Sequence, residues 1–277
     1  MTTSRRSFLV FSAMLPWAYK AFASKSVPVG LELYSVREGL KQDPQGTVRT
    51  VAKMGYECVE FYAPYFEWTE TQTREMRKLM DDLGIKCHST HNDASYVGAD
   101  KIARAADRNH ILGSKYVVVA SSQPKPGLDG WKEIADMLNQ AAATLERSGL
   151  KTGYHNHQPE FTRVEGVRPI EILAKNTKPS VMLQLDVGTC LETGSDPVEW
   201  IRANPGRIRS IHCKDWSSEK GYAVLFGEGS ADWKAIFAAA ESVGGVEYYL
   251  VEQEGSRFSE IETAEKCLAA FRATHRA

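Results

Sequence analysis

Two histidines and a nearby glutamate form the most chemically suggestive stretch of the sequence, Tyr154-His155-Asn156-His157-Gln158-Pro159-Glu160-Phe161. If residues 150–157 form a strand, His155 and His157 project to the same side, because side chains alternate along a strand with a period of two. Imidazole is the commonest metal ligand and carries protons near neutral pH. A lone pair of histidines is more often structural, so this pair indicates a metal or proton-transfer site only if other polar residues gather beside it.

Three further apolar runs end in polar residues that are also spaced two apart. The pairs are Gln184 and Asp186, His212 and Lys214, and Glu252 and Glu254. Burying this many polar groups without partners would be costly, and a divalent ion is the simplest common partner. A shell that mixes imidazole and carboxylate suits Mn, Fe, Co, Ni or Zn. We predict one divalent metal ion held by Asp186, His212 and Glu252 with a residue of the histidine stretch; Mn or Zn is favoured, and Co, Fe or Mg are alternatives.

The elements that carry these pairs repeat along the chain as a short apolar run, a loop and an amphipathic stretch. The predicted strands are 27–34, 58–62, 85–89, 116–120, 152–157, 181–186, 208–212 and 248–252. The predicted helices are 44–54, 70–83, 99–112, 131–147, 169–175, 196–202, 233–242 and 261–273. This alternation of apolar strands and helices predicts a single-domain α/β fold, a (β/α)8 TIM barrel whose active site forms at the C-terminal strand ends. A doubly wound open sheet is the alternative, but no glycine-rich phosphate turn follows any strand.

Several helix boundaries are legible in the sequence. Asp43-Pro44 is typical of a helix start, since proline fits the first helical position. Gly55, Gly84, Gly113 and Gly149 each follow a helical run shortly before a strand, where a left-handed turn is expected.

The first 24 residues differ in kind from the rest of the chain. Arg5-Arg6 precedes a short apolar run at 8–19, and Ala21-Phe22-Ala23 gives the small-x-small pattern that a signal peptidase needs. This combination indicates a twin-arginine export signal at 1–24, followed by the barrel at 25–277. A membrane-anchored N-terminus is the alternative, but the apolar run is too short to span a bilayer. We therefore expect a periplasmic protein that meets the twin-arginine translocation machinery during export.

Composition narrows the class of partner. The chain has 277 residues, a formal net charge of -1 and no basic run, which argues against nucleic-acid binding and favours a small-molecule partner. The five cysteines are scattered and include no CxxC, and those in apolar runs behave as buried hydrophobes, so we predict no disulfide. The sequence leaves open whether the chain forms a homo-oligomer.

Five motifs together resemble the sugar phosphate isomerase/epimerase family with the xylose-isomerase-like barrel. They are YHNHQPEF, QLDVG at 184–188, HCKD at 212–215, GEGSADW at 227–233 and VEQE at 251–254. In metal-dependent ketose epimerases of that superfamily, Glu, Asp, His and Glu at the ends of strands five to eight hold one divalent ion. The resemblance carries the last three onto Asp186, His212 and Glu252. The first falls near His155, where an imidazole replaces the carboxylate that also acts as a base.

The resemblance also implies roles for other residues. Dehydratase-like relatives have a Glu-x-His pair on strand five, which would make His157 the proton shuttle, and Glu160 is the alternative from the loop. Glu252 would be a second base, and Lys214 would bind the substrate oxyanion or form an ion pair with Asp215 or Glu254. We expect four residues to bind substrate: Glu60, His91, Glu228 and Glu254. His91 is expected just past the end of its strand, and Glu32 and Tyr34 are expected at the rim of the site.

The leading functional hypothesis is a metal-dependent isomerase or epimerase that removes a proton next to a carbonyl and stabilises the enediolate. Because sugar phosphates are scarce outside the cytoplasm, we expect an unphosphorylated sugar or keto-sugar. The first alternative is a lyase or hydratase that acts on a keto-sugar or keto-glycoside with the same metal site. The second is a non-catalytic periplasmic sugar-binding protein.

Overall fold

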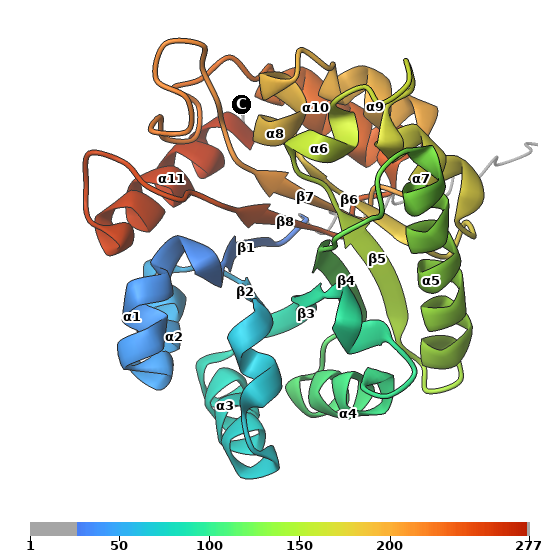
Figure 1. The fold of residues 1–277 in the computed structure, drawn as a ribbon. Helices are drawn as coiled ribbons and strands as arrows, with labels where there is room; N and C mark the ends of the chain where they lie inside the picture. Colours follow the sequence, from blue (N-terminus) through green and yellow to red (C-terminus); the bar gives the residue numbers. More distant parts are fainter. Residues whose placement is uncertain (1–26, 276–277) are drawn as a thin grey trace, which may run out of the picture.

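The computed structural model describes residues 27–275, so the export signal predicted at 1–24 lies outside the described residues. Eight parallel strands close into one barrel in sequence order, with helices around it (Figure 1). The strands are β1 Val29–Glu32, β2 Cys58–Phe61, β3 Lys86–Asp93, β4 Tyr116–Ser121, β5 Lys151–His155, β6 Met182–Asp186, β7 Ser210–Cys213 and β8 Tyr248–Val251. The predicted (β/α)8 barrel is confirmed.

The long helices lie where the amphipathic stretches predict them. They are α2 Pro44–Met54, α3 Glu70–Leu83, α4 Ile102–Leu112, α5 Leu128–Glu146, α7 Pro169–Asn176, α9 Pro197–Ala203, α10 Trp233–Ala239 and α11 Glu260–His275. Helix α2 begins as predicted, because the Asp43 carboxylate accepts a hydrogen bond from the Gly46 N–H and Pro44 follows it. The four predicted glycines all have positive φ, at 98° for Gly55, 71° for Gly84, 76° for Gly113 and 77° for Gly149.

Short helices that the sequence analysis did not predict follow the strands. They are the 3-10 helices Leu33–Val36, Ala63–Glu67 and Ala94–Val97 and the α-helices α1 Arg37–Gln42, α6 Gln158–Phe161 and α8 Val187–Glu192; a π-helical turn, Ala240–Gly244, extends α10. All but the π-helical turn lie at the C-terminal end of the barrel, where they shape the rim around the strand ends.

Two of the differences between predicted and observed strand ends change the position of functional residues relative to their strands. Strand β5 ends at His155, because α6 begins at Gln158 with Pro159 in its first turn, and His157 takes the cap position before it. His157 is therefore not on the strand. Strand β3 continues to Asp93, so His91 lies within the strand and not past its end as expected.

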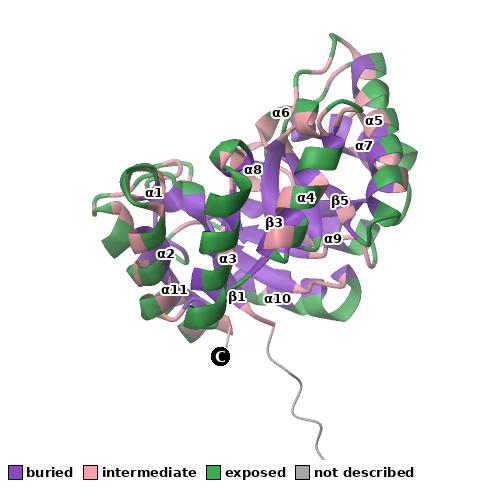
Figure 2. Ribbon diagram, turned by 90° about the horizontal axis from the view of Figure 1, so that it is seen from below, coloured by how far each residue is buried: buried purple, intermediate pink, exposed green. Residues whose placement is uncertain are grey.

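The barrel interior is filled at one end and open at the other. Below the site it is plugged by the buried side chains of Cys58, Tyr116, Val118, Met182, Tyr248 and Leu250. The larger core lies between the strands and the inner faces of the helices, and Figure 2 shows buried strands inside a shell whose exposed residues lie on the outer helix faces. All five cysteines are buried and unpaired, which confirms the prediction of no disulfide. Within residues 27–275, no helix is long and apolar enough to cross a membrane.

Candidate active site

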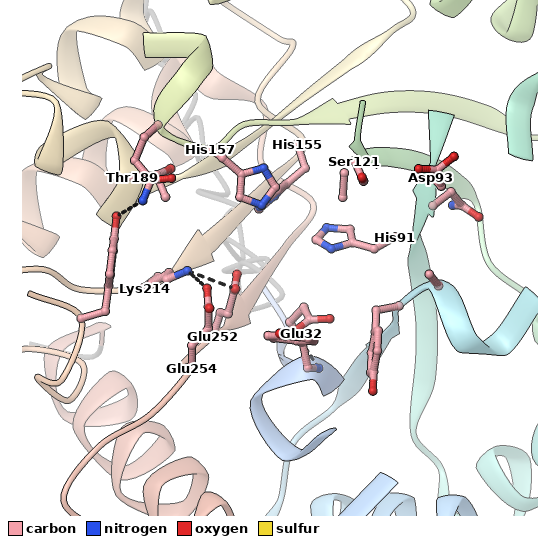
Figure 3. A pocket seen from close by; sticks show the side chains of 17 residues that line it. Glu32, His91, Asp93, Ser121, His155, His157, Thr189, Lys214, Glu252 and Glu254 are labelled. Carbon is pink, nitrogen blue, oxygen red and sulfur yellow. Dashed lines mark hydrogen bonds and ion pairs between the residues drawn. The ribbon is translucent and has the colours of Figure 1, made fainter. Parts of the chain in front are cut away.

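A cavity of about 500 Å³ opens at the C-terminal ends of the strands. Its walls come from residues that follow or end most of the strands, including Glu32 at the end of β1, His91 of β3, His155 of β5 and Glu252 after β8 (Figure 3). The active-site end predicted for a barrel of this kind is therefore the end that holds the cavity.

The four predicted metal ligands converge beneath this cavity. One ligand atom each from His155, Asp186 and Glu252 lies within 4.8 Å of the others, and the same holds for His91, His155 and His212. His155 belongs to both groups, and all of these residues except His91 are buried almost completely. A set of imidazoles and carboxylates packed this closely has the composition of a transition-metal site.

One buried carboxylate oxygen of the cluster has no hydrogen-bond partner. Asp186 caps the N-terminus of α8, where its Oδ1 accepts a hydrogen bond from the Thr189 N–H at 2.9 Å. Its Oδ2 is buried with no hydrogen-bond partner. Its two nearest basic groups are Lys214 Nζ at 3.7 Å and His155 Nε2 at 4.0 Å. An unsatisfied buried carboxylate oxygen is costly, so a cation bound between Asp186, His155 and Glu252 fits the observed geometry.

Lys214 supplies a fixed positive charge at the edge of this cluster. Its Nζ lies 3.4 Å from Glu252 Oε1, contacts Glu254 and sits 4.7 Å from the centre of the Tyr222 ring. Burial alone would lower the pKa of Lys214, but Glu252, Asp186 and Glu254 outweigh it and raise the pKa well above its ordinary value. Lys214 is therefore an ammonium that faces the cavity (Figure 3).

Asp215, the other ion-pair partner considered for Lys214, has a structural role. Its carboxylate accepts hydrogen bonds from the backbone N–H groups of Gly227 at 2.9 Å and Gly229 at 3.2 Å and from Trp233 Nε1 at 2.9 Å. These bonds tie the loop that follows β7 back to its own first residues.

His212 lies between two carboxylates. Its Nδ1 hydrogen-bonds Glu252, and its Nε2 donates to Glu60 Oε2 at 2.7 Å. Burial alone would lower the pKa of His212, but the two carboxylates raise it to about 10. In the absence of a metal ion His212 is therefore an imidazolium. His155 has the opposite environment, because burial and then the neighbouring His212 and His91 lower its pKa well below the ordinary value.

The two candidates for the proton-transfer group occupy different environments. His157 lines the cavity, and its ring centre is 4.9 Å from that of His155. Glu160 does not reach this cavity: its carboxylate accepts hydrogen bonds from the Tyr154 hydroxyl at 2.7 Å and from the His157 N–H at 2.8 Å. The expected swing of Glu160 into the site is absent because α6 uses the carboxylate to cap its first turn.

The predicted substrate-binding residues are divided among three places. His91 and Glu254 line the cavity. Glu60 lies under it, fully buried, and hydrogen-bonds His212. Glu228 is not brought to the cavity, because its carboxylate binds Arg257 Nη2 at 2.7 Å and Nη1 at 3.0 Å at the protein surface.

Sequence reasoning missed or undervalued two residues of the cavity. Tyr222 lines it from the loop after β7, and its hydroxyl accepts from Gln158 Nε2 at 3.0 Å and donates to Glu192 at 2.5 Å. Nothing in the irregular loop sequence distinguishes this tyrosine. Glu32 was expected only at the rim, but it is buried, and its Oε1 has no hydrogen-bond partner. Its position at the end of an apolar strand was the available signal.

The fold agrees with the comparison to known proteins. The family described as "Xylose isomerase-like TIM barrel" matches residues 48–274. The chain belongs to this family. A sugar phosphate isomerase/epimerase from Parabacteroides distasonis has a similar structure, with a TM-score of 0.76 and 27% sequence identity over 94% of this chain and 98% of that one. The resemblance inferred from the five motifs is thus confirmed.

Two further matches cover less of the chain or share fewer identical residues. An inosose dehydratase from Geobacillus thermodenitrificans is 26% identical over 59% of this chain, and the match spans only 61% of that enzyme's length. The structure described as "IOLI protein with a binding zinc atom" has a TM-score of 0.69 and 19% identity over 90% of this chain and 98% of that one, which shows the fold alone. The relatives named here include a sugar phosphate isomerase/epimerase and a dehydratase, so the expectation of a sugar isomerase/epimerase-like enzyme, which allows a lyase, is confirmed at the level of the family.

Proposed function

We propose that this protein is a metal-dependent enzyme that isomerises or epimerises an unphosphorylated sugar or keto-sugar by removing the proton next to the carbonyl carbon. The observation that carries the proposal is the unpartnered, buried Asp186 Oδ2 within a cluster that also contains His155 and Glu252. His155, Asp186, His212 and Glu252 would hold one divalent ion. The zinc named for the IolI structure supports a divalent ion of this class.

A divalent ion held by these residues would supply Lewis acidity for removal of a proton beside a carbonyl. His157 is placed to take and return that proton, since it lines the cavity and its ring lies beside that of His155. The Lys214 ammonium is placed to donate a hydrogen bond to a substrate oxygen that gains negative charge. Glu252 is less free to act as a second base, because His212 and Lys214 each contact one of its oxygens.

The charge of the cavity supports a substrate without phosphate. Four carboxylates line it, those of Glu32, Asp93, Glu252 and Glu254. Lys214 is the one lysine or arginine among the described lining residues, and it already lies beside Glu252, Glu254 and Asp186. A phosphate group is normally held by free cationic or backbone donors, and in this cavity it would face several carboxylates. Neutral sugar hydroxyls, which donate to carboxylates, fit better.

A lyase or dehydratase acting on a keto-sugar is the second candidate, and two observations favour it. Sequence relatives of this chain are named inosose dehydratase. In addition, His157 lines the cavity while Glu252 is paired with His212 and Lys214, and elimination needs one base where epimerisation by a two-base route needs a second on the opposite face of the substrate. The two candidates share the first proton removal and differ in what leaves the neighbouring carbon.

The N-terminal segment supports export of the protein to the periplasm by the twin-arginine route. The support is the Arg5-Arg6 pair, the short apolar run and the Ala21-Phe22-Ala23 pattern. Cell fractionation with N-terminal sequencing of the mature protein tests this. A cytoplasmic protein that keeps Arg5 and Arg6 would contradict it, as would unchanged export of an Arg5→Lys, Arg6→Lys variant.

Metal analysis of the purified protein, followed by a panel of keto-sugars in deuterium oxide, tests the proposed activity. Isomerisation or epimerisation conserves the formula and places deuterium on one carbon, whereas elimination gives an enone absorbance. Turnover should disappear with a chelator and in Glu252→Gln, which would exclude a sugar-binding protein without catalysis. A protein that holds no metal, and whose thermal midpoint is the same with and without Mn²⁺ or Zn²⁺ in both wild type and Asp186→Ala, refutes the proposal.

A further inference from the structure

Glu60 is fully buried beneath the metal cluster and contacts two of its histidines. Its Oε2 accepts from His212 Nε2 at 2.7 Å and lies 3.0 Å from His91 Nε2. Its Oε1 accepts from Gln184 Nε2 at 3.0 Å. Glu60 is therefore bonded on both oxygens and cannot itself ligate the ion at the position bounded by His155, Asp186 and Glu252.

Gln184 extends this network to the histidine of β5. Its Nε2 donates to Glu60, so its Oε1 faces the other way and accepts from His155 Nδ1 at 3.1 Å and from His91 Nε2 at 2.7 Å. A carboxylate can only accept hydrogen bonds, and this fixes which end of the Gln184 amide faces Glu60.

The direction of these bonds decides which imidazole nitrogens are free. His155 carries its proton on Nδ1, so the lone pair on Nε2 points toward Asp186 Oδ2, 4.0 Å away. His212 donates from Nε2 to Glu60, which leaves Nδ1, the atom beside Glu252, as the ligand atom once it loses its proton. His155 thus presents Nε2, and His212 presents Nδ1 beside Glu252, which belongs to the same group as His155 and Asp186.

We propose that Glu60, directly for His212 and through Gln184 for His155, is the positioning residue that sets both imidazole tautomers for metal binding. This inference rests on the proposed metal site and deepens it, because Glu60 was expected to bind substrate and instead acts on the ligands. A carboxylate that receives the second N–H of a metal-bound histidine typically supports metal affinity in this way.

Replacing the carboxylate with an amide disturbs the pattern whichever way the amide turns. In Glu60→Gln, the new amide oxygen must face the Gln184 N–H, so its NH2 group faces His212 and His91. If both amides turn, the NH2 of Gln184 faces His155 Nδ1. In either arrangement one metal-ligating histidine must accept where it previously donated, and its proton moves to the nitrogen that should bind the metal.

Titration of the protein with Zn²⁺ tests the role of Glu60. We expect Glu60→Gln to weaken binding by about 10- to 100-fold. Glu247→Gln is the matched control, because Glu247 hydrogen-bonds Tyr116 and Lys115 at the opposite end of the barrel. The Kd of this control variant for Zn²⁺ should equal that of the wild type. Unfolding midpoints of the metal-free variants identify any loss that comes from folding.

The exchange of the two side chains, Glu60→Gln with Gln184→Glu, is the decisive variant. The carboxylate introduced at position 184 accepts from His155, from His91 and from the NH2 group of the amide introduced at position 60. The oxygen of that amide then accepts from His212. All three histidines keep their acceptors, so the exchange should recover most of the lost affinity. A merely structural role for Glu60 gives no reason for such recovery.

Imidazole ¹⁵N chemical shifts of the metal-free protein read the tautomers directly and need no metal binding. A wild type that does not bind Zn²⁺ would refute the metal site, while the shifts would still test the tautomers. If Glu60→Gln keeps the wild-type chemical shifts and the wild-type Zn²⁺ affinity, the inference about Glu60 is wrong while the metal site stands. The same conclusion follows if the exchange variant binds Zn²⁺ no more tightly than Glu60→Gln. If Glu60→Gln does not fold, Gln184→Met tests the same relay, and it should shift the resonances of His155 but not those of His212.

Discussion

Metal binding should become tighter as the pH rises, because a proton and the metal ion compete for Nδ1 of His212. The two carboxylates on His212 raise its pKa to about 10 in the metal-free protein. The group is therefore protonated at neutral pH and must lose one proton before it can ligate an ion. His155 contributes no second proton, since burial and its histidine neighbours lower its pKa.

The size of the effect follows from the distance between the pH and this pKa. A pH of 7 is roughly 3 units below a pKa of about 10. Removing the proton from His212 at this pH therefore weakens metal binding by roughly 4 kcal/mol. The apparent Kd should fall by about tenfold for each pH unit between pH 6.5 and 8.5. The sign is fixed by the raised pKa, since a lowered pKa would make the affinity independent of pH in this range.

Calorimetric titration with Mn²⁺ in buffers of different ionisation enthalpy provides the assay. The slope of the observed enthalpy against the buffer enthalpy gives the number of protons released, which should be close to one. A slope near zero, together with a constant Kd from pH 6.5 to 8.5, would refute the assignment of His212 as a protonated ligand.

Three further predictions follow from the contacts of single side chains. Asp215→Ala leaves the donors of Gly227, Gly229 and Trp233 without their acceptor and should lower the free energy of unfolding in urea by about 3 kcal/mol, whereas an unchanged value would contradict the anchoring role. Arg257 lowers the pKa of Glu228 to about 2, from an ordinary value of 4.5. The ion pair therefore stabilises the folded protein at pH values above 4.5, and this contribution is lost as the pH falls from 4.5 toward 2. Because the pair is exposed, Glu228→Gln should cost only about 0.5 kcal/mol at pH 6 and nothing near pH 2, and a larger or pH-independent loss in urea unfolding would show another role. His157→Gln should abolish turnover while metal affinity stays the same, and Glu160→Gln should keep turnover but lower the thermal midpoint; the reverse result would exchange their roles.

The sequence contained most of the information on the fold and the positions of the ligands. Apolar runs alternate with amphipathic stretches, and α2 and α3 have the predicted bounds because an N-terminal cap and a left-handed glycine mark each of them. Polar residues at strand ends predicted where Asp186, His212 and Glu252 would meet, because parallel strands of a barrel bring their C-terminal ends together.

The remaining features depend on contacts between residues far apart in the chain. Nothing near Glu60 indicates that it bonds His212 and Gln184, which are 152 and 124 positions away. The direction of Glu160 depended on a local competition, in which the Tyr154 hydroxyl and the first turn of α6 hold the carboxylate away from the cavity. The short helices after the strands were missed because four to six residues are too few to show helical periodicity.

The Asp215 anchor has a consequence for how this enzyme could diversify. Because one carboxylate fixes both ends of the 215–233 segment, the exposed and half-exposed residues 217–223 between those ends can change without loosening the β7 ligand next door. Tyr222, which forms part of the cavity wall, lies in that interval. Selection could therefore remodel the substrate wall while the ion-binding residues stay fixed, and new substrate preferences in relatives of this protein should first be sought in this segment.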